Sequence, residues 1–132
     1  MDSKERLVFF NGELIKESEA KISIYDSALM FGDMVFEMTR SFNKKQFKLK
    51  EHIERLLMGV KIFRIPLRFS ASEIEEACYK TIEANDHLFS HDDEHRLMID
   101  VSRGLLGIYE NIDTLKKGPN LIIADFPLRW TV

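Results

Sequence analysis

Two neighbouring helical patterns in the middle of the chain restrict its fold most strongly. Apolar residues recur at helical spacing over 53–63 and again over 74–82. Ser70 and Glu73 have the spacing of a capping box, which predicts that the second helix begins there. Because each stripe is one-sided, both helices need an apolar surface to pack against, and the flanking segments must supply it.

Patterns typical of strands flank the two helices. Residues 7–10 form an apolar run that meets Asn11-Gly12, and Asn-Gly between apolar stretches is a strong hairpin signal. Residues 34–42 alternate, which predicts a strand with one face buried, and residues 97–102 and 121–126 indicate two more strands. This order predicts an α+β fold, a largely antiparallel sheet with two helices packed on one face.

Two connecting segments lack a regular pattern. Residues 27–33 read as a turn-rich loop that ends near Gly32. Residues 128–132 follow Pro127 and show neither a helix pattern nor a polar tail. We therefore expect the chain to lead into a linker and a second domain.

Composition excludes several classes of partner. The 132 residues fit one domain, and 19 basic against 22 acidic residues give a net charge of -3. No strong basic field exists to attract nucleic acid or anionic lipid, and no apolar run approaches membrane-spanning length. The single cysteine, Cys78, cannot form an internal disulfide, so a reducing, cytoplasmic setting is expected.

Several short motifs occur together and in order. Residues 11–13 and 19–23 form an opening hairpin, residues 26–37 form a loop and strand that end in Val-Phe-Glu, and residues 51–56 read Glu-His-x-x-Arg-Leu. A Ser-Arg-Gly strand end follows at 102–104. Together they resemble the class IV aminotransferases, enzymes of fold type IV that use pyridoxal 5'-phosphate (PLP). Branched-chain aminotransferases, D-amino-acid aminotransferases and aminodeoxychorismate lyases belong to that family.

The resemblance implies that Arg55 binds the phosphate of PLP. A guanidinium suits that role because its planar donors match phosphate oxygens and it stays protonated. The alternative is that Arg55 is an ordinary solvated charge on a helix. His52 lies three residues earlier and would neighbour Arg55 on the helix surface, where a structural role fits it better than a catalytic one.

The resemblance also implies substrate contacts for Phe36, Phe31 and Arg96. Aromatic walls suit an aliphatic side chain, and an arginine suits a carboxylate. The alternatives are core packing for the two phenylalanines and an exposed strand-end charge for Arg96. Phenylalanine rather than tyrosine at position 36 favours a branched-chain substrate, and Ile108 stands about where D-amino-acid and lyase members carry an arginine.

The chemistry of the family depends on a lysine that holds PLP covalently, and that lysine lies in a second domain, beyond Val132. Lys116 and Lys117 are the nearest candidates in sequence and match no motif. We therefore predict no catalytic residue in this chain and expect it to be inactive alone. It is interpreted as the small N-terminal domain, residues 1–132, of a fold-type IV enzyme whose cofactor-lysine domain is absent.

The complete enzyme is expected to move an amino group between a branched-chain-like amino acid and a 2-oxo acid, with PLP as cofactor and as a homodimer. An aminodeoxychorismate-lyase-like enzyme and a non-catalytic binding domain are the alternatives. His87, His91 and His95 are spaced by four, but the Asp92-Asp93 pair between them favours a loop. We therefore predict no metal site.

Overall fold

The chain folds around one six-stranded sheet. A computed structural model describes residues 4–109, 111 and 118–132. The strands are β1 (Leu7–Phe10), β2 (Glu13–Lys16), β3 (Met34–Phe42), β4 (Lys45–Gln46), β5 (His95–Ser102) and β6 (Asn120–Pro127). The helices are α1 (Ser27–Phe31), α2 (Leu49–Ile62) and α3 (Ala71–Asn85), with 3-10 turns η1 (Glu17–Glu19), η2 (Asp86–Leu88), η3 (Gly107–Tyr109) and η4 (Leu128–Thr131).

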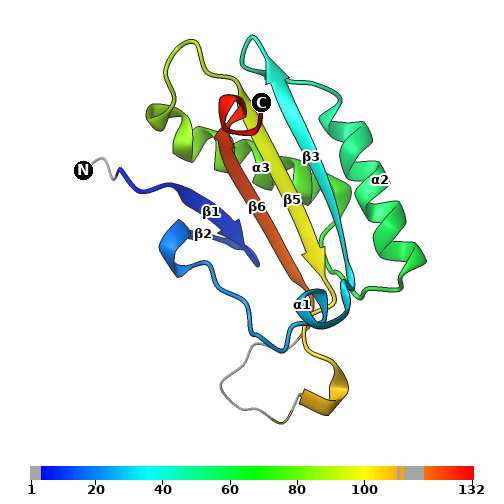
Figure 1. Cartoon of the computed structure of the whole chain (residues 1–132). Helices are drawn as coiled ribbons and strands as arrows, with labels where there is room; N and C mark the ends of the chain where they lie inside the picture. The colour runs from blue at the N-terminus through cyan, green and yellow to red at the C-terminus, as the bar shows by residue number, and fades with distance from the viewer. Residues whose placement is uncertain (1–3, 110, 112–117) are drawn as a thin grey trace.

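All strand pairs in the described residues are antiparallel, in the order β2-β1-β6-β5-β3-β4. Figure 1 shows α2 and α3 together on one side of this sheet. The predicted α+β class, with two helices on one face, is therefore confirmed. The predicted hairpin also forms, with Asn11 and Gly12 at positive φ of 53° and 108° between β1 and β2.

The core lies between the helices and the sheet. The strands contribute Phe9, Leu97, Ile99, Val101, Leu121 and Ile123, and the helices contribute Leu49, Ile53, Leu56, Val60, Ile74, Ala77 and Cys78. Both predicted helical stripes therefore face the sheet. Phe63 is the exception, because it caps the end of α2 and is 49% exposed.

Strand β3 alternates as predicted, but its covered face is the more polar one. Glu37, Thr39 and Ser41 are buried on the helix side, whereas Phe36 is 59% exposed. We call the side of the sheet away from α2 and α3 the open face. It is defined by Phe36, Arg96, Met98, Asp100 and Ile122, which the strand registers place on one side.

Two local expectations were wrong. The segment 27–33 is not an irregular loop, because Asp26 caps the short helix α1 and Gly32 ends it with φ of 69°. The segment 128–132, expected to have no helix, forms the 3-10 turn η4. Trp130 of η4 stacks on Phe126 of β6, with 6.0 Å between the ring centroids.

No described helix is long and apolar enough to cross a membrane. The thiol of Cys78 lies in the core, where burial raises its pKa to about 12. A thiol with so high a pKa is a poor nucleophile, as expected for a packing residue.

A buried histidine ties β5 to β6 at the far end of the sheet from α1. The ring of His95 is 1% exposed, its Nδ1 lies 2.9 Å from the Asp125 carboxylate, and its Nε2 lies 3.1 Å from Asp86. Phe89 stacks on the ring at 3.8 Å, and Arg6 reaches toward Phe89. Burial lowers the pKa of His95, but the two carboxylates outweigh burial and raise it above its ordinary value.

This arrangement predicts a pH-dependent contribution to stability. Protonated His95 stabilises the fold below the unfolded pKa of about 6.5, and this stabilisation is lost as pH rises through the raised folded pKa. We expect the difference in unfolding free energy between wild type and His95→Gln to be largest at about pH 6 and to shrink as pH rises. Urea denaturation across this range measures the difference. His91→Gln, at a side chain 92% exposed, is the control and should leave the profile unchanged.

Candidate functional site

An ion pair at the edge of the sheet organises the candidate site. The carboxylate of Glu37 on β3 accepts two hydrogen bonds from Arg55 on α2, from Nε and Nη2, each at 2.7 Å. The ring Nδ1 of His52 lies 2.7 Å from the same carboxylate. Glu37 is 8% exposed at its side chain and Arg55 is 71% exposed, so a nearly buried anion holds a guanidinium at the surface.

The charges in this network support one another. Arg55 lowers the pKa of Glu37 against the opposing effect of burial, and His52 lowers it further. Glu37 in turn raises the pKa of Arg55. Because Glu37 engages Nε and Nη2, the Nη1 of Arg55 has no hydrogen-bond partner among the described residues. That nitrogen can donate to a ligand.

A recess of about 300 Å³ opens beside this pair and is lined by Lys48, Glu51, His52 and Arg55. Lys48 is the N-cap of α2, at φ of 54°, and Lys48, His52 and Arg55 belong to the first two turns. Three of the four lining side chains can carry positive charge, which suits a phosphate dianion. The donor set therefore fits the phosphate of PLP, the role that the sequence predicted for Arg55.

Phe36 and Arg96 lie on the open face instead. Neighbouring residues of a strand point to opposite faces, so Phe36 points away from the helix side where its neighbour Glu37 meets Arg55. Arg96 shares the face of Phe36 but lies near the other end of β5, opposite Arg40. Four residues of strand, about 13 Å, separate Arg96 from Asp100, the residue paired with Phe36.

Arg96 has an unused donor. Its Nε is buried and has no hydrogen-bond partner in the described part of the chain. Arg40, directly opposite, turns away, because its Nε bonds the carbonyl of Ser41 and its guanidinium lies 3.8 Å from the Phe42 ring centroid. The carboxylate contact expected of Arg96 therefore stays a prediction.

Phe31 ends α1 and is 66% exposed. Asp26 fixes this helix to the sheet, because its carboxylate accepts from the backbone N–H of Ala28, from Ser102 and from Asn120. Figure 1 shows α1 at the end of the sheet where β3 begins. The fold thus brings Phe31 and Phe36 to one end of the sheet and leaves Arg96 toward the other.

Other candidates are not brought into this site. Arg103 donates to Asp33 and to the carbonyl oxygens of Phe63 and Arg64, so it fastens the end of β5 to the end of α2. His95 is committed to its two aspartates, and the described residues form no group that could hold a metal ion. Lys116 and Lys117 lie outside the described residues.

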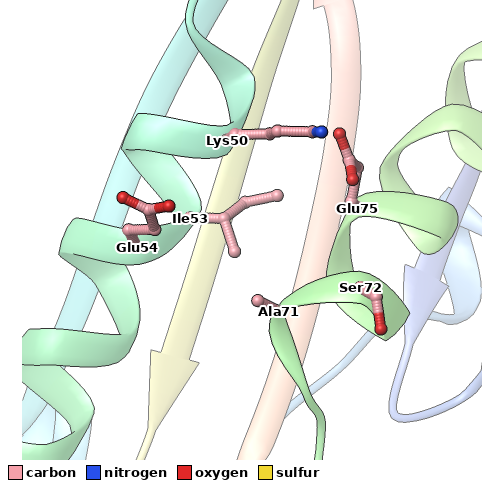
Figure 2. A pocket seen from close by; sticks show the side chains of 6 residues that line it. All are labelled: Lys50, Ile53, Glu54, Ala71, Ser72 and Glu75. Carbon is pink, nitrogen blue, oxygen red and sulfur yellow. The ribbon is translucent and has the colours of Figure 1, made fainter.

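A second recess, of about 200 Å³, lies between α2 and α3. In Figure 2, Lys50 of α2 and Glu75 of α3 point toward one another across it, and Ile53 lies at its base. Its charges are mixed and its apolar floor belongs to the core. The recess therefore lacks the cationic donor set found beside Arg55.

The sequence analysis did not identify three residues that build or support the candidate site. Glu37 is part of the Val-Phe-Glu motif, and alternation indicated only that it lies on the opposite face from Phe36. Lys48 belongs to no recognisable motif. Its place in the recess depends on the left-handed backbone conformation at the start of α2, which the sequence pattern does not indicate. Asp26 could have been found as a capping aspartate before residues 27–31.

Comparisons with known proteins identify the family of the chain. The sequence profile of the family described as amino-transferase class IV matches residues 34–131. The chain belongs to the class IV aminotransferase family. It is 37% identical over 78 residues to a D-alanine aminotransferase of Staphylococcus aureus, covering 59% of this chain and 28% of that protein. It is 33% identical over 101 residues to a putative branched-chain-amino-acid aminotransferase of Methanocaldococcus jannaschii, covering 76% of this chain and 34% of that protein.

Solved structures of the family share the fold. The branched-chain amino acid aminotransferase of Escherichia coli aligns with a TM-score of 0.78 and 29% identity, covering 93% of this chain and 40% of that one. The branched-chain aminotransferase of the thermophilic archaeon Thermoproteus uzoniensis, solved with norvaline, aligns with a TM-score of 0.76 and 27% identity, covering 93% of this chain and 41% of that one. The chain thus spans about a third of the length of its curated relatives.

The anchoring of α1 gives a test of the site's scaffold. Asp26→Ala removes the acceptor for three donors, two of them on buried side chains of the sheet, so we expect the unfolding free energy to fall by about 3 kcal/mol. Urea denaturation measures the loss, and faster hydrogen exchange at the Ala28 amide would locate it in α1. Asp92→Ala, at an 84% exposed side chain, should change stability by less than about 0.5 kcal/mol. Equal stability of both variants would contradict the anchoring role.

Proposed function

We propose that this chain is the small domain of a PLP-dependent aminotransferase that exchanges an amino group between a branched-chain amino acid and a 2-oxo acid. One observation carries the proposal. In a class IV chain, Glu37 holds Arg55 in a cationic recess, and the neighbouring Phe36 faces the other side of the same strand. One strand thus serves a phosphate site and a substrate wall.

PLP, when bound, supplies the electron sink that amino transfer requires. Within this chain, Arg55 would hold its phosphate through Nη1, while Glu37 keeps the guanidinium in place and His52 fixes Glu37 from the other side. Lys48 adds positive charge to the recess. The lysine that attaches the cofactor would come from the rest of the natural protein, or from a second polypeptide.

The substrate contacts proposed for this chain are Phe36, Phe31 and Arg96. The exposed rings of Phe36 and Phe31 would contact an aliphatic side chain, and the partly buried Arg96 would bind a carboxylate. A homodimer in the cytoplasm remains part of the proposal. The exposed apolar side chains around α1 (Ile24, Leu29, Phe31 and Ile108) are what a surface covered by more protein requires.

Two other functions use the same features differently. An aminodeoxychorismate-lyase-like enzyme would use the same cofactor site with another substrate, and the aliphatic Ile108, 77% exposed, offers no charge to an aromatic acid. A non-catalytic domain would use the Arg55 recess to bind a phosphate ligand without any attached cofactor. Covalent capture of PLP separates this last function from the two enzymes.

The cofactor test uses the natural protein that contains these 132 residues. We expect borohydride to fix PLP covalently to it, and Arg55→Met to weaken PLP binding about tenfold or more, because a charge-assisted hydrogen bond is lost. Absorbance titration measures the affinity. Arg68→Met, at an exposed arginine outside the recess, is the matched control and should bind as wild type does. Absence of any covalent capture would favour the non-catalytic function.

The substrate test compares amino donors with one acceptor, 2-oxoglutarate. We expect kcat/KM to be higher for L-leucine and L-isoleucine than for D-alanine, because the Phe36 and Phe31 rings suit branched aliphatic groups. A preference for D-alanine would retain the aminotransferase and replace the substrate class. Release of pyruvate from aminodeoxychorismate, without amino transfer, would identify the lyase.

A further inference from the structure

One carboxylate on the open face has no partner among the described residues. Along β5, Leu97, Ile99 and Val101 are fully buried beneath the helices, and Asp100 points the other way. In the strand registers Asp100 lies directly opposite Phe36 of β3 on one side and Ile122 of β6 on the other. The sheet thus places an ionisable group in the middle of an apolar row.

Three buried carboxylates in the described part of the chain are all engaged. Asp26 accepts from Ser102 and Asn120, Glu37 accepts from Arg55, and Asp125 bonds His95. Asp100, by contrast, has no hydrogen bond or ion pair in the described residues, although its side chain is partly buried. Burial raises its pKa to about 6, so the group is ionised at neutral pH and neutral in mild acid.

An unpaired carboxylate beside apolar groups is costly unless a cation or a donor reaches it. Phe36, which lies opposite Asp100 on β3, indicates that a cation fits better than a neutral hydrogen-bond donor. Residues directly opposite in antiparallel strands have Cβ atoms about 5 Å apart, so a group that touches the Phe36 ring is also within reach of Asp100. The ring is 59% exposed, and the face of an aromatic ring attracts cations.

We propose that Asp100 and Phe36 together bind the side-chain ammonium group of a diamino acid such as L-ornithine, and so extend the substrate range beyond aliphatic amino acids. This inference rests on the proposed function, in which Phe36 is a substrate wall. The α-amino group is the one exchanged with the 2-oxo acid, and the side-chain ammonium is held without reacting.

The protonation state of Asp100 decides which side chain it favours. Ionised Asp100 attracts an ammonium group, whereas protonated Asp100 presents no charge to an aliphatic side chain. The preference for a cationic donor should therefore rise with pH through about 6, since the raised pKa of Asp100 lies there. A permanently neutral side chain at position 100 should remove this pH dependence.

The kinetic test uses L-ornithine and L-norleucine, whose side chains have the same length and differ in the terminal ammonium or methyl group. In the natural protein, we expect Asp100→Asn to lower the ratio of kcat/KM for ornithine to that for norleucine about tenfold. We also expect the ratio to rise with pH in wild type and not in the variant. Asp92→Asn, an equal change of charge at an exposed site, should leave the ratio at its wild-type value. The same ratio in Asp100→Asn and wild type overturns the inference.

A binding test separates failure of this inference from failure of the proposed function. Carbon-13 NMR of the 132-residue chain follows the Asp100 carboxyl with pH, in n-propylammonium chloride and in matched n-propanol. A cation that binds the ionised form lowers the measured pKa of Asp100, and we expect this only with propylammonium. If the natural protein captures no PLP, the proposed function fails and this titration alone decides the role of Asp100. If the pKa of Asp100 is the same in propylammonium and in propanol, Asp100 does not bind an ammonium group.

Discussion

Alternation along β3 is the constraint on which the rest of the site depends. Because adjacent residues of a strand face opposite sides, Phe36 and Glu37 cannot serve the same surface. Glu37 turns toward α2 and fixes Arg55, and Phe36 is left on the open face. A shift of one residue in the register of β3 would exchange the two roles and would bury Phe36 while exposing the anion. The strong pairing of β3 with β5 holds that register along seven residue pairs.

Polar networks at the two ends of the sheet hold the site's supports in place. At one end, the Asp26 carboxylate joins the cap of α1 to β5 and β6 through Ser102 and Asn120. At the other end, His95 joins β5 to Asp125 of β6. Between them the helix side of β5 and β6 is apolar, and the functional groups lie at the margins of this core. Gly104 allows the close approach of the chain near α1, because a Cβ there would lie 2.0 Å from the Gly118 carbonyl oxygen.

The sequence was sufficient for the parts of the fold that rest on periodicity and turn chemistry. The Asn11-Gly12 hairpin, the capping box at Ser70 and the two helical stripes all follow from local physics. Helix α1 was not predicted, because five residues are too few for an apolar period and the helix depends on the tertiary bonds of Asp26. The side of β3 that would be covered was also beyond pattern reasoning. The covered face of β3 can hold the buried carboxylate of Glu37 because Arg55 of α2 donates hydrogen bonds to it.

The most direct measurement is phosphorus-31 NMR of PLP bound to the natural protein, with Glu37→Gln beside the wild type. Phosphate held by Arg55 in the cationic recess should stay dianionic, so the wild-type resonance should not move through the range where free phosphate monoesters titrate, near about pH 6. In Glu37→Gln, where the guanidinium loses its anionic anchor, the resonance should begin to titrate. A wild-type resonance that titrates like free PLP would show that Arg55 does not hold the phosphate, and it would contradict the account.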